Sequence, residues 1–231
     1  MFSIWSILLL AVFVVVAIIH LVHCYQRKLG LSDITKFVLM PLLAAFYVVA
    51  CLGMPFGLIN ILVLCALALF WVGDILLIYD WERASFFFGM FTFLLAQIAL
   101  IVVACIFFAN YSFPIIEGLV IAVVFIIILA IKLLFLRKPF AFIGLKACAT
   151  LYLISTTVLA YLLLMLAIAN PNRYTIYLAI GGINFMLSDY HVVQEYYISG
   201  NNLSRFMIML GYLIGTCFIV VGYAGLQLQA M

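Results

Sequence analysis

Two aspartates lie near the ends of long apolar segments in a repeated local pattern. The first pattern is Phe70-Trp71-Val72-Gly73-Asp74, and the second is Phe185-Met186-Leu187-Ser188-Asp189. Each consists of Phe, two residues, a small residue and Asp, and the two aspartates are 115 positions apart in a chain of 231 residues. An ionisable side chain inside a membrane span is costly and usually functional. The matched positions therefore predict one shared site with Asp74 and Asp189 as its catalytic residues.

The composition places these aspartates in a membrane protein. Hydrophobic residues make up 71% of the chain and charged residues 7%, whereas soluble domains carry about 25% charged residues. Apolar runs of about 20 residues indicate membrane-spanning helices, because barrel strands would alternate with period two. The net charge of +3 comes from single or paired basic residues beside the apolar runs. We therefore expect the lipid bilayer, and no nucleic acid, as a partner.

The polar residues between the apolar runs divide the chain into segments that must position the aspartates. We expect an all-α polytopic protein, a single integral membrane domain over residues 1–231. Its eight transmembrane helices are predicted at about 3–23, 33–52, 58–79, 84–108, 115–136, 141–169, 174–197 and 203–227. The aspartates then lie on the third and seventh helices, which run in the same direction. This placement predicts a parallel four-plus-four repeat with halves of about 1–114 and 115–231.

The basic residues predict the orientation of the helices. Nine of the ten lie on one side of the predicted membrane: Arg27, Lys28, Lys36, Arg83, Lys132, Arg137, Lys138, Lys146 and Arg205. Arg173 lies on the other. Because cytoplasmic loops carry an excess of Lys and Arg, we expect both termini outside and the site open to the cytoplasmic half. In a bacterium this would be the cytoplasmic membrane; the sequence leaves the oligomeric state open.

Two lysines have matching places in the predicted halves. Lys36 opens the second helix and Lys146 opens the sixth, each one helix before its aspartate. The lysines and aspartates could meet in a cavity that faces the cytoplasm, where the lysines would bind substrate. Two other interpretations remain open: the lysines extend to lipid phosphates, or an Asp–Lys pair is only structural.

Other polar residues near the aspartates are further candidates for substrate binding. They are Gln97, Asn184 and Ser188. Hydrogen bonds between helices are the alternative role for Gln97 and Asn184. Ser188 is a poor nucleophile candidate, because it has no base partner and no nucleophile-elbow motif.

Metal and cofactor chemistry has little support in the sequence. The six cysteines form no C-x-x-C pair, and the three histidines form no metal-binding pattern. We therefore expect no metal ion and no cofactor.

Several short motifs, taken in order, resemble the YhhN family, the lysoplasmalogenase family of eight-helix membrane proteins. They are Lys36, Met40-Pro41-Leu42-Leu43, Gly73-Asp74, Gly89, Phe93, Gly181-Gly182, Phe185 and Ser188-Asp189. The resemblance covers most of the chain, from about Lys36 to Asp189. The chain departs from the family pattern on the fourth helix, where family members commonly carry a His and Gln97 is found here.

The resemblance implies a hydrolase that cleaves the vinyl ether bond of lysoplasmalogens. The lysophospholipid substrate would yield a fatty aldehyde and a glycerophospho-head-group product. This reaction needs one carboxylic acid to protonate the β-carbon and one carboxylate to stabilise the oxocarbenium ion and activate water, as in glycosidases. Two carboxyl groups that share a dry cavity do not both ionise, so the aspartate pair supplies both forms.

Two other functions remain open on the sequence alone. A small membrane transporter with a parallel repeat would also place charges between its halves, although its site would lie near the membrane midplane. A non-catalytic lipid-binding membrane protein is the second alternative, and the Gln at position 97 keeps it open.

Overall fold

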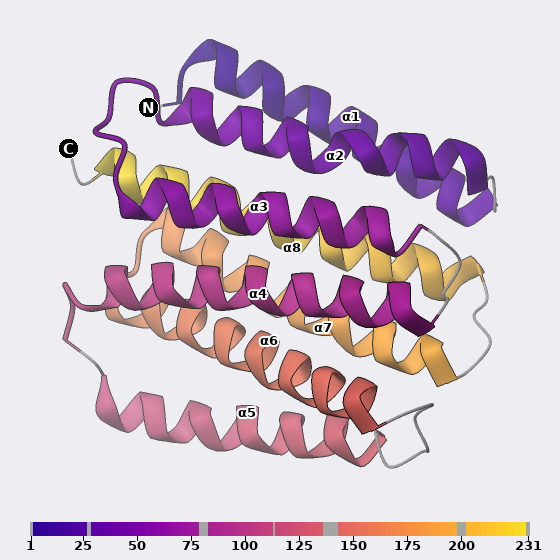
Figure 1. Ribbon diagram of the computed structural model, residues 1–231. Helices are drawn as coiled ribbons and strands as arrows, with labels where there is room; N and C mark the ends of the chain where they lie inside the picture. Colours follow the sequence, from indigo (N-terminus) through magenta and orange to yellow (C-terminus); the bar gives the residue numbers. More distant parts are fainter. Residues whose placement is uncertain are drawn as a thin grey trace.

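The computed structural model describes residues 2–26, 29–78, 83–112, 114–135, 143–197 and 202–229. All regular secondary structure in these ranges is helical. The helices are α1 (Ile4–Gln26), α2 (Leu29–Ala50), α3 (Leu58–Leu76), α4 (Arg83–Phe108), α5 (Ile115–Phe135), α6 (Ile143–Ala169), α7 (Arg173–Tyr197) and α8 (Asn202–Gln229). They run roughly parallel and antiparallel to one another, and both ends of the chain lie at the same end of the bundle (Figure 1).

Seven of the eight described helices are long and apolar enough to cross a membrane. The chain is therefore a multi-pass membrane protein by length and composition. The helix that does not qualify is α7, which carries Asn184, Ser188 and Asp189. Ser188 and Asp189 are buried, so polar residues on this helix face the inside of the bundle.

Three helix boundaries differ by three residues or more from the sequence prediction. α1 ends at Gln26, three residues after its predicted end at His23. α2 begins at Leu29, four residues before the predicted start at Asp33. Ser32, which precedes the predicted start, is already part of this helix and is buried. α3 ends at Leu76. Its predicted end at Tyr79 lies outside the described residues.

α2 remains helical through Pro41 because another helix supplies the missing donor. Proline has no N–H, so the carbonyl of Phe37 loses its partner within the helix. The indole Nε1–H of Trp71 on α3 donates to this carbonyl at 2.9 Å. Trp71 of the first aspartate pattern thus fastens α3 to α2.

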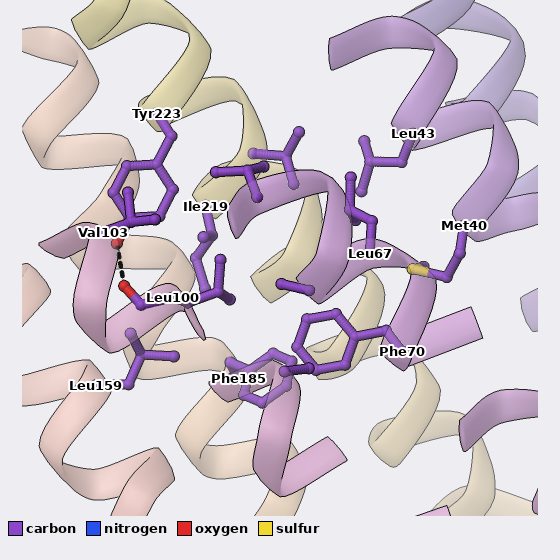
Figure 2. Packing of buried hydrophobic residues seen from close by; sticks show 14 of the residues in the cluster. Met40, Leu43, Leu67, Phe70, Leu100, Val103, Leu159, Phe185, Ile219 and Tyr223 are labelled. Atoms are coloured by element: carbon purple, nitrogen blue, oxygen red, sulfur yellow. Dashed lines mark hydrogen bonds between the residues drawn. The ribbon is translucent and has the colours of Figure 1, made fainter. Parts of the chain in front are cut away.

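The two phenylalanines of the aspartate patterns meet in the core of the bundle. The rings of Phe70 on α3 and Phe185 on α7 are 5.4 Å apart between centroids, as Figure 2 shows from close by. Each ring lies about one turn before its aspartate. This contact brings the aspartate-bearing ends of α3 and α7 together.

The small residue of each pattern lies where the next helix of the chain approaches closely. A Cβ atom at Gly73 would lie 2.5 Å from a ring carbon of Phe93 on α4. In the second pattern, a Cβ at Gly211 of α8 would lie 3.0 Å from the Cβ of Ser188. Small residues at such crossings allow membrane helices to approach closely, here α3 to α4 and α7 to α8.

The halves of the chain interlock through their last helices. α4 packs against α6, and α8 packs against α2 as well as α1. α5 lies at one edge of the bundle and packs mainly against α6 (Figure 1). The region between α3, α4, α7 and α8 is therefore the centre of the molecule.

Candidate active site

A cavity of about 370 Å³ lies near the end of the bundle where α1, α3 and α7 finish and α2, α4 and α8 begin. Asp74 of α3 and Asp189 of α7 both line it. Both side chains are almost completely buried. The fold thus brings the two aspartates of the repeated pattern to one cavity.

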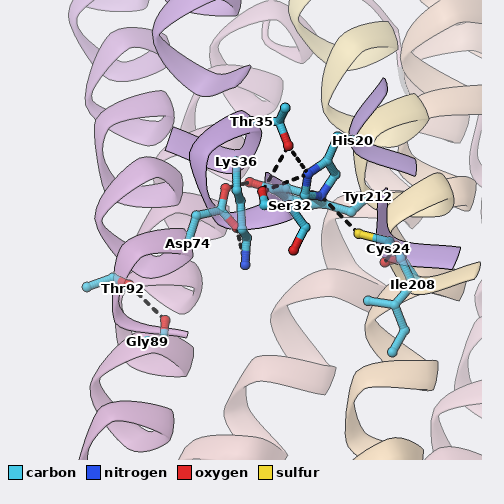
Figure 3. Close-up of polar contacts among 11 residues, drawn as sticks. His20, Cys24, Ser32, Thr35, Lys36, Asp74, Gly89, Thr92, Ile208 and Tyr212 are labelled. Atoms are coloured by element: carbon cyan, nitrogen blue, oxygen red, sulfur yellow. Dashed lines mark hydrogen bonds and ion pairs between the residues drawn. The ribbon is translucent and has the colours of Figure 1, made fainter. Parts of the chain in front are cut away.

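Asp74 has a cationic partner and a neutral partner. The ammonium of Lys36 on α2 lies 3.3 Å from Oδ1 of Asp74, and the side chains are 14% and 4% exposed respectively. The hydroxyl of Tyr212 on α8 donates to Oδ2 at 2.9 Å. Figure 3 shows Lys36, Asp74 and Tyr212 converging from three helices. A charge-assisted contact of this kind favours a carboxylate at Asp74.

Asp189 is held directly by neutral hydrogen-bond donors. The hydroxyl of Tyr152 on α6 donates to Oδ1 at 2.5 Å. The amide Nε2 of Gln97 on α4 donates to Oδ2 at 2.9 Å. Ser155 in turn donates to Oε1 of Gln97, which orients the amide so that its NH₂ group faces Asp189. Both oxygens of Asp189 therefore have a partner that carries no charge.

The contacts of the two aspartates follow the offset of the sequence pattern. Tyr212 lies 115 positions after Gln97, and Asp189 lies 115 positions after Asp74. Each aspartate is bonded by a residue of the preceding helix and by one from the last helix of the other half. This crossed pattern favours the parallel four-plus-four repeat, which remains a prediction.

The predicted binding residues separate into two groups. Lys36 and Ser188 line the cavity, and Gln97 is buried against Asp189. The hydroxyl of Ser188 donates to the carbonyl of Ile208 at 2.7 Å, so it joins α7 to α8. Asn184 does not line the cavity; its amide donates to the carbonyl of Ile180, one turn earlier on α7.

The structure does not bring Lys146 to Asp189. Lys146 is exposed on α6 and does not line the cavity. The predicted match between Lys146 and Lys36 was wrong because these lysines are 110 positions apart, whereas the two aspartates are 115 positions apart. Five residues turn a helix by about 140°, so Lys146 lies on a different face of its helix. The residue that faces Asp189 from α6 is Tyr152.

Sequence reasoning missed three residues around the aspartates. Tyr152 and Tyr212 looked like ordinary aromatic residues of apolar segments, although the offset of 115 from Gln97 leads to Tyr212. The third is Lys132, which the sequence placed among the basic residues flanking the membrane. Its side chain is instead buried, because its ammonium donates to the carbonyl of Met186 inside the bundle at 3.2 Å.

His20 on α1 lines the cavity and joins α1 to α2 (Figure 3). Its Nδ1 lies 3.1 Å from the carbonyl oxygen of Ser32 and 2.8 Å from Oγ1 of Thr35. Because a carbonyl only accepts, the Ser32 contact requires the hydrogen on Nδ1. The cavity also includes Asp33 and Arg205.

Within the described residues, no group of three His, Cys, Asp or Glu side chains is arranged to hold a metal ion.

This arrangement can carry out acid–base chemistry on a molecule that enters the cavity. It provides two buried carboxyl groups with different partners, and apolar walls that include Phe86, Met90 and Met209. General acid and general base action needs one protonated and one ionised group, and two neighbouring carboxyl groups with different partners are able to supply them.

Comparison with known proteins adds one finding. A search of curated proteins and a search of solved structures each found no match. The family model described as the YhhN family matches residues 31–223, which includes both aspartates, all residues that bond to them, and most of the chain. This chain belongs to the YhhN family.

Proposed function

We propose that this protein is a membrane-embedded hydrolase that cleaves the vinyl ether bond of lysoplasmalogens. The observation that carries the proposal is the pair of buried aspartates on one cavity, Asp74 with a lysine partner and Asp189 with neutral partners. Membership of the YhhN family supports the same activity. The products are a fatty aldehyde and a glycerophospho-head-group compound.

The partners of each aspartate suggest its role. Asp189, held by Tyr152 and Gln97, is the acid that protonates the β-carbon of the vinyl ether. The proton addition leaves an oxocarbenium ion on the carbon bonded to oxygen. Asp74, kept ionised by Lys36, stabilises this cation and takes a proton from the water that attacks it. As the C–O bond of the resulting hemiacetal breaks, Asp74 returns its proton to the departing alcohol oxygen and Asp189 takes the proton of the hemiacetal hydroxyl, so the aldehyde forms and both groups are restored. This division of labour is like that of glycosidases.

The walls of the cavity suit a single-chain amphiphile. The apolar side chains of Phe86, Met90 and Met209 would contact the alkenyl chain. Lys36, which is 14% exposed, is close enough to the cavity to contact the substrate phosphate as well as Asp74. The head group would then lie at the membrane surface and the vinyl ether beside the carboxyl groups.

The test is aldehyde release from lysoplasmalogen by the purified protein, with a 1-acyl lysophospholipid as the substrate control. Asp74→Asn and Asp189→Asn should each remove most of the activity, and the double variant should lose little more, because residues that act as one unit have non-additive effects. Glu117→Gln, which alters an exposed carboxylate on α5, is the matched control. Near-full turnover in either aspartate variant would refute the proposal.

The same assay separates the alternatives. Saturable lysophospholipid binding without aldehyde release would identify a lipid-binding protein. Movement of substrate across a vesicle membrane without cleavage would identify a transporter, although the cavity lies toward one end of the bundle and not at its middle.

We propose further that all eight helices span the membrane, with both termini outside and the cavity in the cytoplasmic half. The bias of nine basic residues to one supports this orientation. A reporter fused after Met231 that is active only outside the cytoplasm should give a signal. A signal from a cytoplasm-only reporter at that position would reverse the orientation.

A further inference from the structure

Lys132 is a buried cation that the proposed reaction does not yet use. Its helix, α5, is apolar along most of its length and lies at the edge of the bundle (Figure 1). The Lys132 side chain nevertheless turns inward and is only 4% exposed. A charged side chain within a membrane span is costly, so a lysine that faces the protein interior is a candidate for function.

The ammonium of Lys132 is attached to the helix that carries Asp189. It donates to the carbonyl oxygen of Met186 at 3.2 Å, and Met186 lies three residues before Asp189 on α7. Around this contact, Phe125 of α5, Ala160 of α6 and Met186 form a small buried cluster. Lys132 does not line the cavity, so it reaches α7 without touching a molecule bound there.

Lys132 is also a cation that acts on Asp189. The two groups interact electrostatically, whereas Tyr152 of α6 and Gln97 of α4 donate hydrogen bonds directly to the carboxyl oxygens of Asp189. The other charged or titratable groups that line the cavity are His20 and Cys24 of α1, Asp33 and Lys36 of α2, Asp74 of α3, and Arg205 and Tyr212 of α8. Lys36 is paired with Asp74 at 3.3 Å, whereas Lys132 is bonded to the helix that carries Asp189.

We infer that Lys132 is a positioning residue that stabilises the carboxylate formed when Asp189 gives its proton to the substrate; this inference rests on the proposed function. When the O–H bond of Asp189 breaks and the new C–H bond forms, a negative charge remains on the buried side chain of Asp189. A fixed positive charge nearby lowers the cost of that charge. Lys132 therefore makes Asp189 a stronger acid without contacting the substrate.

The experiment compares the wild type with Lys132→Met, Lys132→Gln, Lys132→Arg and the control Glu117→Gln. Gln keeps a donor for the Met186 carbonyl but carries no charge, and Arg keeps the charge. We expect Lys132→Met and Lys132→Gln each to lower kcat about tenfold or more with little change in KM. A tenfold loss of rate corresponds to the same free energy as a change of about one unit in the pKa of the acid. The alkaline limb of the pH–rate profile should move up by about one pH unit, because the ionised form of Asp189 is less stable without the cation. Lys132→Arg should restore both kcat and the position of the alkaline limb.

A second readout does not depend on turnover. The infrared carbonyl band of protonated Asp189, identified by its loss in Asp189→Asn, can be followed against pH. This band should persist to higher pH in Lys132→Met and Lys132→Gln than in the wild type, in Lys132→Arg and in Glu117→Gln. The same titration in all five proteins would overturn the inference, as would a loss of kcat in Lys132→Met and Lys132→Gln without any movement of the profile.

The two readouts keep this inference distinct from the proposed function. If the wild type releases no aldehyde, the proposed function fails, and the infrared titration still decides whether Lys132 controls the proton on Asp189. If Asp189→Asn abolishes aldehyde release while Lys132→Met titrates like the wild type, the proposed function stands and the role of Lys132 fails.

Discussion

Removing Lys36 should destabilise the fold more than removing Lys36 and Asp74 together. Lys36→Met leaves the Asp74 carboxylate without its cation, although that side chain is only 4% exposed. Breaking one side of a buried ion pair costs about 3–5 kcal/mol, and we expect about 3 because Tyr212 still donates to Asp74. Asp74→Asn leaves Lys36, which is 14% exposed, and should cost only about 1 kcal/mol, the net worth of a typical hydrogen bond. The double variant has no uncompensated charge and should also lose about 1 kcal/mol.

The measurement is a double-mutant cycle on unfolding in mixed detergent micelles, followed by tryptophan fluorescence. The double variant should be about 2 kcal/mol more stable than Lys36→Met, roughly a thirtyfold difference in the unfolding equilibrium constant. Glu117→Gln combined with Lys146→Met, two exposed side chains, gives the additive control cycle. If the effects of Lys36→Met and Asp74→Asn simply add, the ion pair does not stabilise Asp74 as the geometry indicates. The assignment of Asp74 as the group that is ionised before the reaction would then fail as well.

Three further outcomes follow from the packing and the site. Gly73→Ala should cost about 1–3 kcal/mol in the same unfolding assay, because its Cβ would lie 2.5 Å from the ring of Phe93; unchanged stability would mean that α4 moves freely away from α3. Lys146→Met should leave aldehyde release unchanged, since the side chain is exposed and outside the cavity; a large rise in KM would restore it as a phosphate ligand. Gln97→Leu should lower kcat about a hundredfold by removing a donor to Asp189, whereas Gln97→His, which keeps a donor, should lose much less. Equal losses in both position-97 variants would show that donation to Asp189 is not what matters there.

Hydropathy and local spacing were enough to predict the class of protein and most of its helices. A run of about 20 apolar residues has one stable form in a bilayer, so the helices could be located to within a few residues. The cost of a charge in such a run also marked Asp74 and Asp189 as candidate site residues from the sequence alone. The start of α2 was harder to locate, because Ser32 and the polar Asp33 look like part of a loop, whereas Ser32 is helical and buried, and its carbonyl contacts His20 of α1.

The partners of the aspartates depended on how distant helices pack. Lys36 and Gln97 were named from their residue types, but only the tertiary structure, in which α4 packs against α6, shows that Gln97 donates a hydrogen bond to Asp189. The directions of the Lys146 and Lys132 side chains were both misjudged. Successive residues of a helix point about 100° apart, and in a uniformly apolar segment the sequence does not show which face is buried. The sequence by itself therefore determined that two carboxyl groups lie in a membrane helix bundle, because burial of charge is a local cost. Which side chains surround them was decided by the tertiary structure, because those contacts join residues as many as 138 positions apart.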